Sequence, residues 1–298
     1  MQTRYPHGPC AAAGTLSLAE NMTVNRMGFG AMRLTGPGIW GEPADRAAAG
    51  RVLRRALELG VNFIDTANSY GPEVNERLIA EFLHPYPAGV VIATKGGLVR
   101  PGPGRWEADG RPEQLRAACE GSLRRLRVEC IDLYQLHTPD RRRVPLDDSI
   151  GALSRLQSEG KIRHIGVSNV DLGELRRAQD LVTVISVQNR YNLEDRTSED
   201  VLMHCQQHGI AFIPWFPLEA GRHATASGSS GAGAVLGEIA KSHRVTMAQV
   251  ALAWLLAHSP AMLPIPGTSS VNHLEENVAA AAIRLSAEEL ARLDGTGA

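Results

Sequence analysis

Short apolar segments alternate with longer amphipathic segments along most of the chain. Eight short segments, most of them rich in Val and Ile, have the pattern of buried strands: 26–32, 61–67, 90–95, 130–137, 164–169, 184–192, 210–218 and 262–268. A helical pattern follows each of them, which is the order of a parallel sheet covered by helices. Eight strands fit a closed (β/α)8 TIM barrel of the α/β class better than an open doubly wound sheet.

The amphipathic segments predict helices that begin and end at recognisable signals. The predicted helices span 45–60, 73–83, 112–126, 146–159, 172–181, 198–208, 236–242, 247–258 and 271–281. Pro112 suits a first helical turn, and Gly60 and Gly160 suit helix ends. Residues 15–25 predict an N-terminal β-hairpin. We therefore expect one barrel domain over residues 1–298, with extra helices near the C-terminus and a flexible start at residues 1–20.

Composition and charge narrow the range of partners. The net charge of −1 favours neither nucleic acid nor an anionic membrane. The sequence shows no apolar segment long enough for a signal peptide or a membrane span, so we expect a cytoplasmic protein, either a monomer or a weak homo-oligomer. The four cysteines lack metal-ligand spacing. The Gly- and Ser-rich segment 224–234 is either a linker or a lid over a ligand.

Polar residues stand at the ends of successive predicted strands. They are Asp65, Lys95, His137, Ser168, Asn169, Gln188 and Asn189, with Trp215 near the end of the next strand. A single polar strand end is usually a turn residue or a helix cap. In a barrel, however, the C-terminal strand ends meet at one mouth, so these side chains are expected to form one site.

The charged members of this set suggest proton chemistry. Only three lysines stand against twenty-eight arginines, and Lys95 is one of them. Asp65 and Lys95 on adjacent strands can pair, and a nearby ammonium favours the phenolate form of Tyr70. With His137 to orient an oxygen, Tyr70 could protonate a carbonyl oxygen as it becomes an alkoxide. Metal binding is the competing use of these residue types, but the histidine and carboxylate spacing does not support it, so no metal is expected.

The motifs taken together resemble the aldo-keto reductases, NAD(P)H-dependent enzymes built on a (β/α)8 barrel. They are GVNFIDTANSYG, VVIATKGG, IDLYQLHTPD, GKIRHIGVSN, VQNRYN and IPGTSSVNHLEEN, in the order found in that family. The resemblance implies a catalytic tetrad of Asp65, Tyr70, Lys95 and His137, with the tyrosine as general acid. It implies an oxidoreductase that passes hydride from NADPH to a small-molecule aldehyde or ketone.

The resemblance also assigns the cofactor contacts. It places Ser168, Asn169 and Gln188 at the nicotinamide carboxamide and Trp215 on the nicotinamide ring. Phe216, Pro217 and Leu218, with the glycine-rich segment after them, would follow the pyrophosphate. Further contacts are implied for Gly30, Met32, Asp65, Gly267, Thr268, Ser269, Ser270, His273, Glu276 and Asn277, the last seven around the adenosine end.

The sequence departs from the family where the ribose 2′-phosphate would bind. Many members have Lys and Arg there, whereas this chain has Gly267 and His273. NADP(H) is the expected cofactor, and NAD(H) is the alternative. The segment GTSS leads into a predicted helix, whose free N–H groups suit a phosphate. The GFG of residues 28–30 lacks the third glycine of a dinucleotide fingerprint.

Within the family, AMRLTGPGIWGEPADR and the IPGTSS ending look most like bacterial members related to pyridoxal reductases. This likeness implies a pocket for an aromatic carbonyl, lined by Trp40, Tyr70, Trp106 and His137; ordinary packing is the alternative for the tryptophans. Arg100, Arg105 and the run 141–143 form either a patch for anionic substrates or, more commonly, a solvated face. Two other functions use the same residues: an NAD-linked alcohol dehydrogenase, and a cofactor-binding regulatory module.

Overall fold

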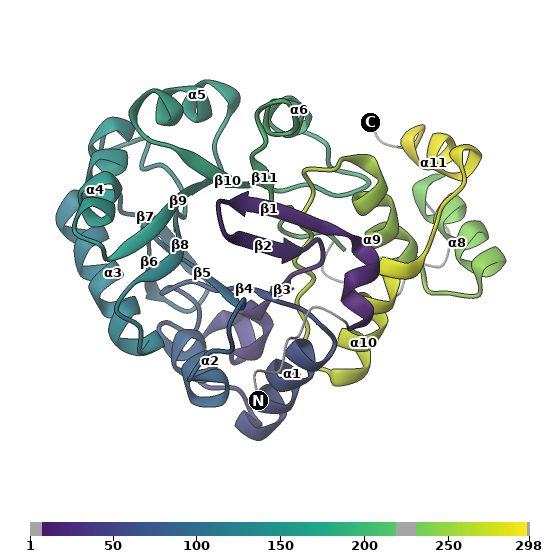
Figure 1. The fold of residues 1–298 in the computed structure, drawn as a ribbon, viewed down its shortest axis with the longest axis horizontal. Helices are drawn as coiled ribbons and strands as arrows, with labels where there is room; N and C mark the ends of the chain where they lie inside the picture. The colour runs from purple at the N-terminus through teal and green to yellow at the C-terminus, as the bar shows by residue number, and fades with distance from the viewer. Residues whose placement is uncertain (1–7, 219–230, 297–298) are drawn as a thin grey trace.

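A curled parallel sheet of seven strands forms the centre of the protein, a computed structural model that describes residues 8–218 and 231–296. In order across the sheet, the strands are β11 (Ala211–Phe212), β10 (Val184–Gln188), β9 (Ile162–Ser168), β8 (Ile131–Leu136), β5 (Val91–Gly96), β4 (Phe63–Asp65) and β3 (Phe29–Gly30). Every neighbouring pair is parallel. Figure 1 shows the strands near the middle of the molecule and the helices around them.

Helices follow the strands as the alternating pattern predicts. Those after the first six strands are α1 (Arg46–Glu58), α2 (Val74–Leu83), α3 (Pro112–Leu126), α4 (Leu146–Ser158), α5 (Leu172–Leu181) and α6 (Glu199–His208). The C-terminal part adds α8 (Gly231–His243), α9 (Met247–His258), α10 (Val271–Ala279) and α11 (Ala287–Asp294). Short 3-10 helices occupy η1 (Pro9–Ala13), η2 (Ala31–Leu34), η3 (Pro37–Ile39) and η5 (Ala280–Ala282). Within the described residues, no helix is both long enough and apolar enough to cross a membrane.

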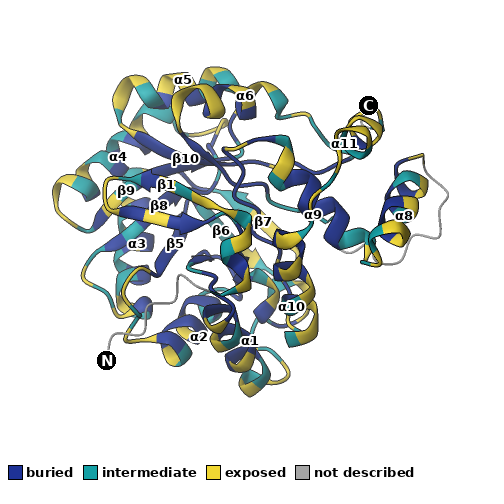
Figure 2. Ribbon diagram, turned by 45° about the vertical axis from the view of Figure 1, so that its right-hand side comes forward, coloured by how far each residue is buried: buried dark blue, intermediate teal, exposed yellow. Residues whose placement is uncertain are grey.

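The helix boundaries have local causes. Pro112 opens α3, as predicted, because a residue at the first turn needs no N–H. Gly60 and Gly160 follow α1 and α4 with φ of 88° and 73°, a backbone region that glycine adopts without strain. Figure 2 shows that the strands of the central sheet are mostly buried, whereas many exposed residues lie on the outer sides of the helices.

The predicted N-terminal hairpin is confirmed and covers one end of the sheet. Strands β1 (Thr15–Ala19) and β2 (Met22–Asn25) pair antiparallel. Leu18 and Met22 join an apolar cluster with residues at the starts of the sheet strands, such as Phe63 and Val91. Since the hairpin covers the end where the strands begin, the polar C-terminal strand ends lie at the opposite end (Figure 1).

The predicted eighth strand, residues 262–268, is not a regular strand. It forms one bridge, from Met262 to Phe212. Backbone hydrogen bonds nevertheless join this segment to both outer strands: Leu263 N–H donates to Phe212 O at 2.8 Å, and Gly28 N–H donates to Pro264 O at 2.8 Å. Prolines at 264 and 266 lack the N–H groups that a regular ladder needs. Pro214 and Pro217 similarly limit β11 to two residues of the predicted 210–218.

Several other elements differ from the predictions. The antiparallel hairpin of β6 (Leu98–Gly102) and β7 (Arg105–Ala108), and helix α11, were not expected. The predicted helix 271–281 divides into α10 and η5, and the helix predicted at 236–242 begins earlier, at Gly231. Of the Gly- and Ser-rich segment 224–234, expected to be a linker or a lid, residues 224–230 lie outside the described residues. Residues 1–7 of the expected flexible start also lie outside them.

Candidate active site

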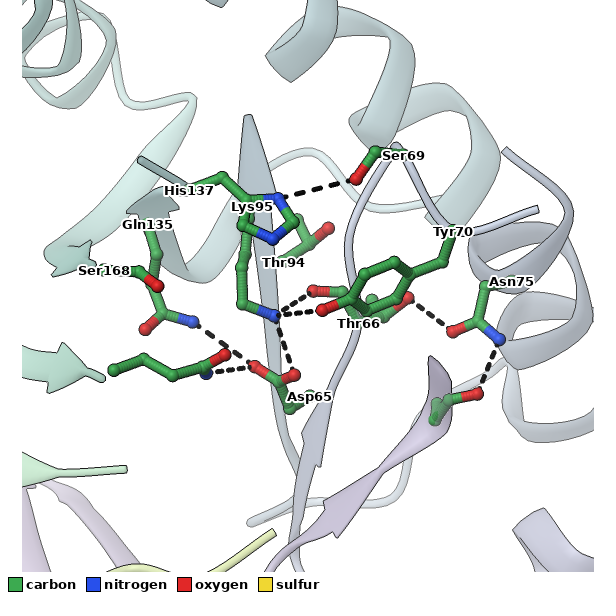
Figure 3. A network of polar contacts seen from close by, with 12 residues as sticks. Asp65, Thr66, Ser69, Tyr70, Asn75, Thr94, Lys95, Gln135, His137 and Ser168 are labelled. Atoms are coloured by element: carbon green, nitrogen blue, oxygen red, sulfur yellow. Dashed lines mark hydrogen bonds and ion pairs between the residues drawn. The ribbon is translucent and has the colours of Figure 1, made fainter. Parts of the chain in front are cut away.

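The predicted strand-end residues meet at one end of the sheet. Asp65 ends β4, Lys95 lies near the end of β5, His137 follows β8, Ser168 ends β9 and Gln188 ends β10. Register brings them together, because Ser168 pairs with Gln188 and Lys95 pairs with Gln135 of β8. Figure 3 shows the side chains of Asp65, Lys95, His137 and Ser168 gathered in one region.

The Lys95 ammonium is the centre of this group. Its three N–H groups have three acceptors: Asp65 Oδ2 at 2.7 Å, the Thr66 carbonyl oxygen at 2.8 Å and the Tyr70 hydroxyl oxygen at 3.3 Å. Lys95 is fully buried and Asp65 is 2% exposed. A buried charge is tolerated where it is paired and hydrogen-bonded, and this ammonium has its full complement of acceptors.

Asp65 is held from the other side by two amides. Gln188 Nε2 donates to Asp65 Oδ1 at 2.8 Å and Gln135 Nε2 donates to the same oxygen at 3.4 Å. Gln135 was not among the predicted site residues, although a polar residue within the apolar segment IDLYQLH was a signal for it. These bonds fix the carboxylate that orients Lys95.

Tyr70 enters from the loop after β4. Its ring lies edge-on to the His137 ring, with centroids 5.8 Å apart, and the Lys95 Nζ lies 5.1 Å from the Tyr70 ring centroid. Burial raises the pKa of Tyr70, and the opposing effect of Lys95 does not reverse this. The sequence suggested only the lowering effect of the ammonium, whereas in the structure burial is the larger effect and the pKa of Tyr70 lies above its ordinary value.

Burial and neighbouring groups also shift the pKa values of Lys95 and His137. Burial lowers the pKa of Lys95, but Asp65 and Tyr70 together outweigh it and hold that pKa above its ordinary value. Burial, with a further effect of Lys95, places the pKa of His137 well below its usual range. The site therefore combines a charged lysine with a neutral imidazole. The His137 Nδ1 lies 3.4 Å from Ser69 Oγ, a second residue that was not predicted from the sequence.

A further network of hydrogen bonds connects this site to the segment just after β3. Thr66 Oγ1 donates to Asn75 Oδ1 at 2.6 Å, and Asn75 Nδ2 donates to the Ala31 carbonyl oxygen at 2.8 Å. Asn75 is fully buried in α2. The loop that carries Tyr70 is thereby connected to the residues that follow Gly30 (Figure 3).

The residues expected at the nicotinamide also come together. Asn169 has a left-handed φ of 57°. Its Nδ2 donates to the His137 carbonyl oxygen at 2.9 Å and to Ser168 Oγ at 3.2 Å, and its Oδ1 accepts from Trp215 Nε1 at 2.9 Å. Trp215 and Phe216 are partly exposed. Amide and hydroxyl groups beside a partly exposed indole suit an aromatic ring with an amide substituent.

The residues expected at the adenosine end lie at the start of α10. Ser270 caps the helix, and in the described part of the chain the backbone N–H groups of Val271 and Asn272 have no acceptor. Free N–H groups at a helix N-terminus suit a phosphate. Thr268 and Asn277 are buried, whereas Gly267, Ser269, His273 and Glu276 are exposed. The donors present therefore fit a dinucleotide phosphate.

The side chain of a basic residue that was not predicted from the sequence, Arg33, lies beside Gly267. A Cβ at Gly267 would lie 3.6 Å from Arg33 Cγ and 2.6 Å from the Gly30 carbonyl oxygen. Arg33 is exposed in η2, directly after Met32, which is partly exposed. In the sequence, the signal that could have indicated Arg33 is a basic residue directly after the first predicted sheet strand, residues 26–32.

The two tryptophans expected at the substrate pocket come from different segments. The Trp106 ring lies edge-on to Tyr70, with centroids 6.4 Å apart, and Trp40 forms a backbone bridge to Gly71. Of the arginine run 141–143, Arg141 pairs with Glu174 and donates to the Asn169 carbonyl oxygen, and Arg143 pairs with Asp140. Within the described residues, no group of His, Cys, Asp and Glu side chains is arranged to hold a metal.

Comparison with known proteins agrees with this geometry. The sequence pattern of the Aldo/keto reductase family matches residues 26–298. The chain belongs to this family. An uncharacterized oxidoreductase of Schizosaccharomyces pombe is 51% identical over 285 residues, which cover 96% of this chain and 90% of that protein.

Two further relatives are similar over nearly the whole aldo/keto reductase chain. Pyridoxine 4-dehydrogenase of Escherichia coli is 41% identical over 280 residues, covering 92% of this chain and 95% of that protein. A solved aldo/keto reductase from Klebsiella pneumoniae, in complex with NADP and acetate, matches with a TM-score of 0.78 and 31% identity, covering 94% of each chain. The family predicted from the motifs is confirmed, and this protein is an oxidoreductase of the aldo/keto reductase family.

Proposed function

We propose that this aldo/keto reductase uses NADPH to reduce an aldehyde or ketone, with Tyr70 as the proton donor. The observation that carries the proposal is the buried contact of Lys95 with both Asp65 and Tyr70. Asp65 holds Lys95 in place, and Lys95 contacts the Tyr70 phenol. A phenol in this position is suited to donating its proton to a strong base. A carbonyl oxygen that gains an electron pair is such a base.

The direction of the hydrogen bonds supports this role. The Tyr70 oxygen accepts from Lys95, so its own hydrogen is free to donate to a ligand. When the carbonyl carbon gains hydride, its oxygen takes the Tyr70 proton and the product is an alcohol. The phenolate left behind lies beside the Lys95 ammonium, which stabilises it.

His137 is the second group at the reacting oxygen in this proposal. A neutral imidazole can donate one hydrogen bond without adding a positive charge beside Lys95. Its edge-on position against Tyr70 lets both groups reach one oxygen. We assign His137 the orientation of the carbonyl and Tyr70 the proton transfer.

The proposed cofactor is NADP(H), because the donor set fits it and the Klebsiella relative binds NADP. When bound, the nicotinamide supplies the hydride. Ser168, Asn169 and Gln188 hold the carboxamide and Trp215 stacks on the ring. Phe216, Pro217 and Leu218 follow the pyrophosphate; the glycine-rich segment assigned with them lies mostly outside the described residues. The residues around the start of α10 hold the adenosine end, and NADH is the alternative because Gly267 and His273 carry no fixed charge.

We also propose that the seven-stranded sheet belongs to a closed eight-stranded barrel that forms one domain. The hydrogen bonds from residues 261–264 to Phe212 on one side and to Gly28 on the other support this closure. Closure would bring the ends of β3 and β11 to one mouth and unite the cofactor residues in a single groove.

The proposed substrate is a small aromatic carbonyl compound of the pyridoxal type. Trp106 beside Tyr70 and the 41% identity to pyridoxine 4-dehydrogenase support this choice. The name of that relative describes the reverse reaction, oxidation of an alcohol. The same residues serve it, with the Tyr70 phenolate as base.

The test is a direct assay. Purified protein is mixed with NADPH or NADH and a panel of aldehydes that includes pyridoxal, and the loss of reduced-nicotinamide absorbance is followed. We expect turnover with NADPH and an aromatic aldehyde, and the reverse reaction with NADP⁺ and the corresponding alcohol. Absence of both cofactor binding and turnover across the panel would exclude the enzymatic function.

A further inference from the structure

Arg100 of β6 joins three segments that surround the proposed substrate pocket. The hairpin of β6 and β7 begins just after β5, which carries Lys95. The Arg100 Cζ lies 3.7 Å from the centroid of the Trp106 ring and 5.3 Å from that of the Trp40 ring. The guanidinium therefore contacts both tryptophans that the sequence assigns to the pocket, although they are 66 residues apart in the chain.

The N–H groups of Arg100 are used for backbone contacts. Nε donates to the Arg105 carbonyl oxygen at 3.0 Å and Nη2 to that of Gly38 at 3.3 Å. Nη1 donates to the carbonyl oxygens of Ile39 at 2.9 Å and Ser69 at 3.2 Å. A guanidinium has five N–H groups, so these four bonds leave one for any other partner.

These contacts give Arg100 a role that the sequence did not suggest. Burial lowers the pKa of Arg100, and no carboxylate in the described part of the chain opposes that effect. The side chain is partly exposed, and four of its five N–H groups already donate to backbone carbonyl oxygens. Its guanidinium connects carbonyl groups from three segments of the chain: residues 38–39, Ser69 and Arg105.

Arg100 is also connected to the backbone on both sides of Tyr70, directly at Ser69 and through Ile39 at Gly71. Ser69, whose carbonyl Arg100 contacts, precedes Tyr70, and Gly71 follows it. The Gly71 N–H donates to the Ile39 carbonyl oxygen at 3.3 Å, and the Gly41 N–H donates to the Gly71 carbonyl oxygen at 2.6 Å. Ile39 is thus a shared acceptor of Arg100 and Gly71. The Tyr70 loop and the two indoles therefore contact the same guanidinium.

We propose that Arg100 is a positioning residue that holds Trp40 and Trp106 as the aromatic wall of the substrate pocket and so sets a preference for planar aromatic aldehydes. The inference rests on the proposed function, because it concerns the substrate of the Tyr70 site. Trp106 is 37% exposed beside Tyr70, so the wall has indole surface to offer a flat ring. A small aliphatic aldehyde needs the acid but gains little from the wall.

The test compares Arg100→Met and Arg100→Lys with Arg105→Met. The Arg105 side chain pairs with Glu107 on the exposed side of the same hairpin, so it is a matched control. For each variant, kcat and KM are measured with pyridoxal and with propanal.

We expect Arg100→Met to raise KM for pyridoxal about tenfold or more, the factor expected for losing roughly 1.4 kcal/mol of binding, while propanal kinetics change little. Arg100→Lys should fail to rescue, because an ammonium cannot stack as a plane or reach four carbonyls. Arg105→Met should match the wild type.

A second variant keeps the test valid if Arg100→Met does not fold. Trp106→Ala removes an exposed ring of the wall directly and should shift the same selectivity ratio. Equal pyridoxal-to-propanal selectivity in the wild type and in the Arg100 or Trp106 variants would overturn the inference about Arg100 while leaving the reductase function intact. A wild-type protein that turns over neither aldehyde would instead contradict the proposed function itself.

Discussion

The Lys95 ammonium lies 2.7 Å from Asp65 Oδ2, and water reaches neither side chain to any extent. Removing one partner of a buried pair leaves the other charge without compensation, at a cost of about 3–5 kcal/mol. Asp65→Asn keeps the shape of the side chain and removes its charge. We expect a loss of unfolding free energy of this size, measured by urea denaturation, together with a large fall in turnover.

An exposed ion pair provides the control for Asp65→Asn. Arg46 pairs with Glu81 on the helical surface, where both side chains are about two-fifths exposed. Glu81→Gln should cost less than about 1 kcal/mol. Equal stabilities of Asp65→Asn and the wild type would show that the charge of Asp65 does not stabilise the buried lysine.

Tyr70→Phe tests the proposed proton donor. The change removes one oxygen and little volume, so kcat should fall about 10²- to 10⁴-fold, the usual contribution of a general acid, while cofactor affinity stays within a few-fold. Tyr86→Phe is the control: the Tyr86 hydroxyl donates to the Leu126 carbonyl oxygen on the outer side of the sheet. Turnover unaffected by Tyr70→Phe would remove Tyr70 from its assigned role.

His137 predicts a loss of stability in acid. Its folded pKa lies well below the ordinary value of about 6.5, because burial and Lys95 disfavour the charged ring. As the pH falls below about 6.5, the unfolded chain binds a proton there and the folded chain does not. The free energy of unfolding should therefore decrease, by up to about 1.4 kcal/mol per pH unit from this residue.

The contribution of His137 can be isolated by comparing variants. Unfolding free energies of the wild type and His137→Gln, measured between about pH 7 and pH 5, should converge or cross as the pH falls, since the variant lacks this group. His84→Gln, at an exposed position, is the control substitution. Parallel pH curves for the wild type and His137→Gln would show that the ring is not held neutral.

The sequence predicted the site better than it predicted the sheet edges, for a physical reason. Asp65, Lys95, His137, Ser168 and Gln188 each lie at or next to the end of a regular strand, and parallel register then brings strand ends together regardless of the details of the loops. The segment 262–268 has the composition of a strand, yet its prolines cannot complete a ladder. Composition alone does not determine which donors find partners.

The role of Arg100 shows the opposite case. The segment around it, LVRPGPGRW, has the composition of a turn, and the hairpin of β6 and β7 was not expected. The contacts of Arg100 come from Gly38, Ile39, Ser69 and Arg105, so its role depends on where three loops meet. The pKa of Tyr70 is similar: Lys95 could be seen in the sequence, but the burial that outweighs it could not.

The close approach of Gly267 to Gly30 predicts how the cofactor preference is set. A Cβ at Gly267 would lie 2.6 Å from the Gly30 carbonyl oxygen, nearer than such contacts occur, so a lysine at this position requires the backbone to shift. Gly267→Ala should therefore cost about 1–3 kcal/mol of stability, the usual penalty for overpacking. If NADPH is the cofactor, as proposed, the positive charge for its 2′-phosphate has to come from a neighbouring residue, and the side chain of Arg33 lies against this glycine.

Arg33→Ala tests this substitute directly. A hydrogen bond to a charged group contributes about 1.5–3 kcal/mol, so if Arg33 binds the 2′-phosphate, its removal should lower kcat/KM for NADPH by about tenfold or more. The value for NADH, which has no 2′-phosphate, should remain unchanged. Arg124→Ala, an exposed arginine on the outer helix α3, should alter neither value. If Arg33→Ala leaves the NADPH to NADH ratio as it was, the 2′-phosphate is bound without Arg33, and His273 becomes the residue to substitute next.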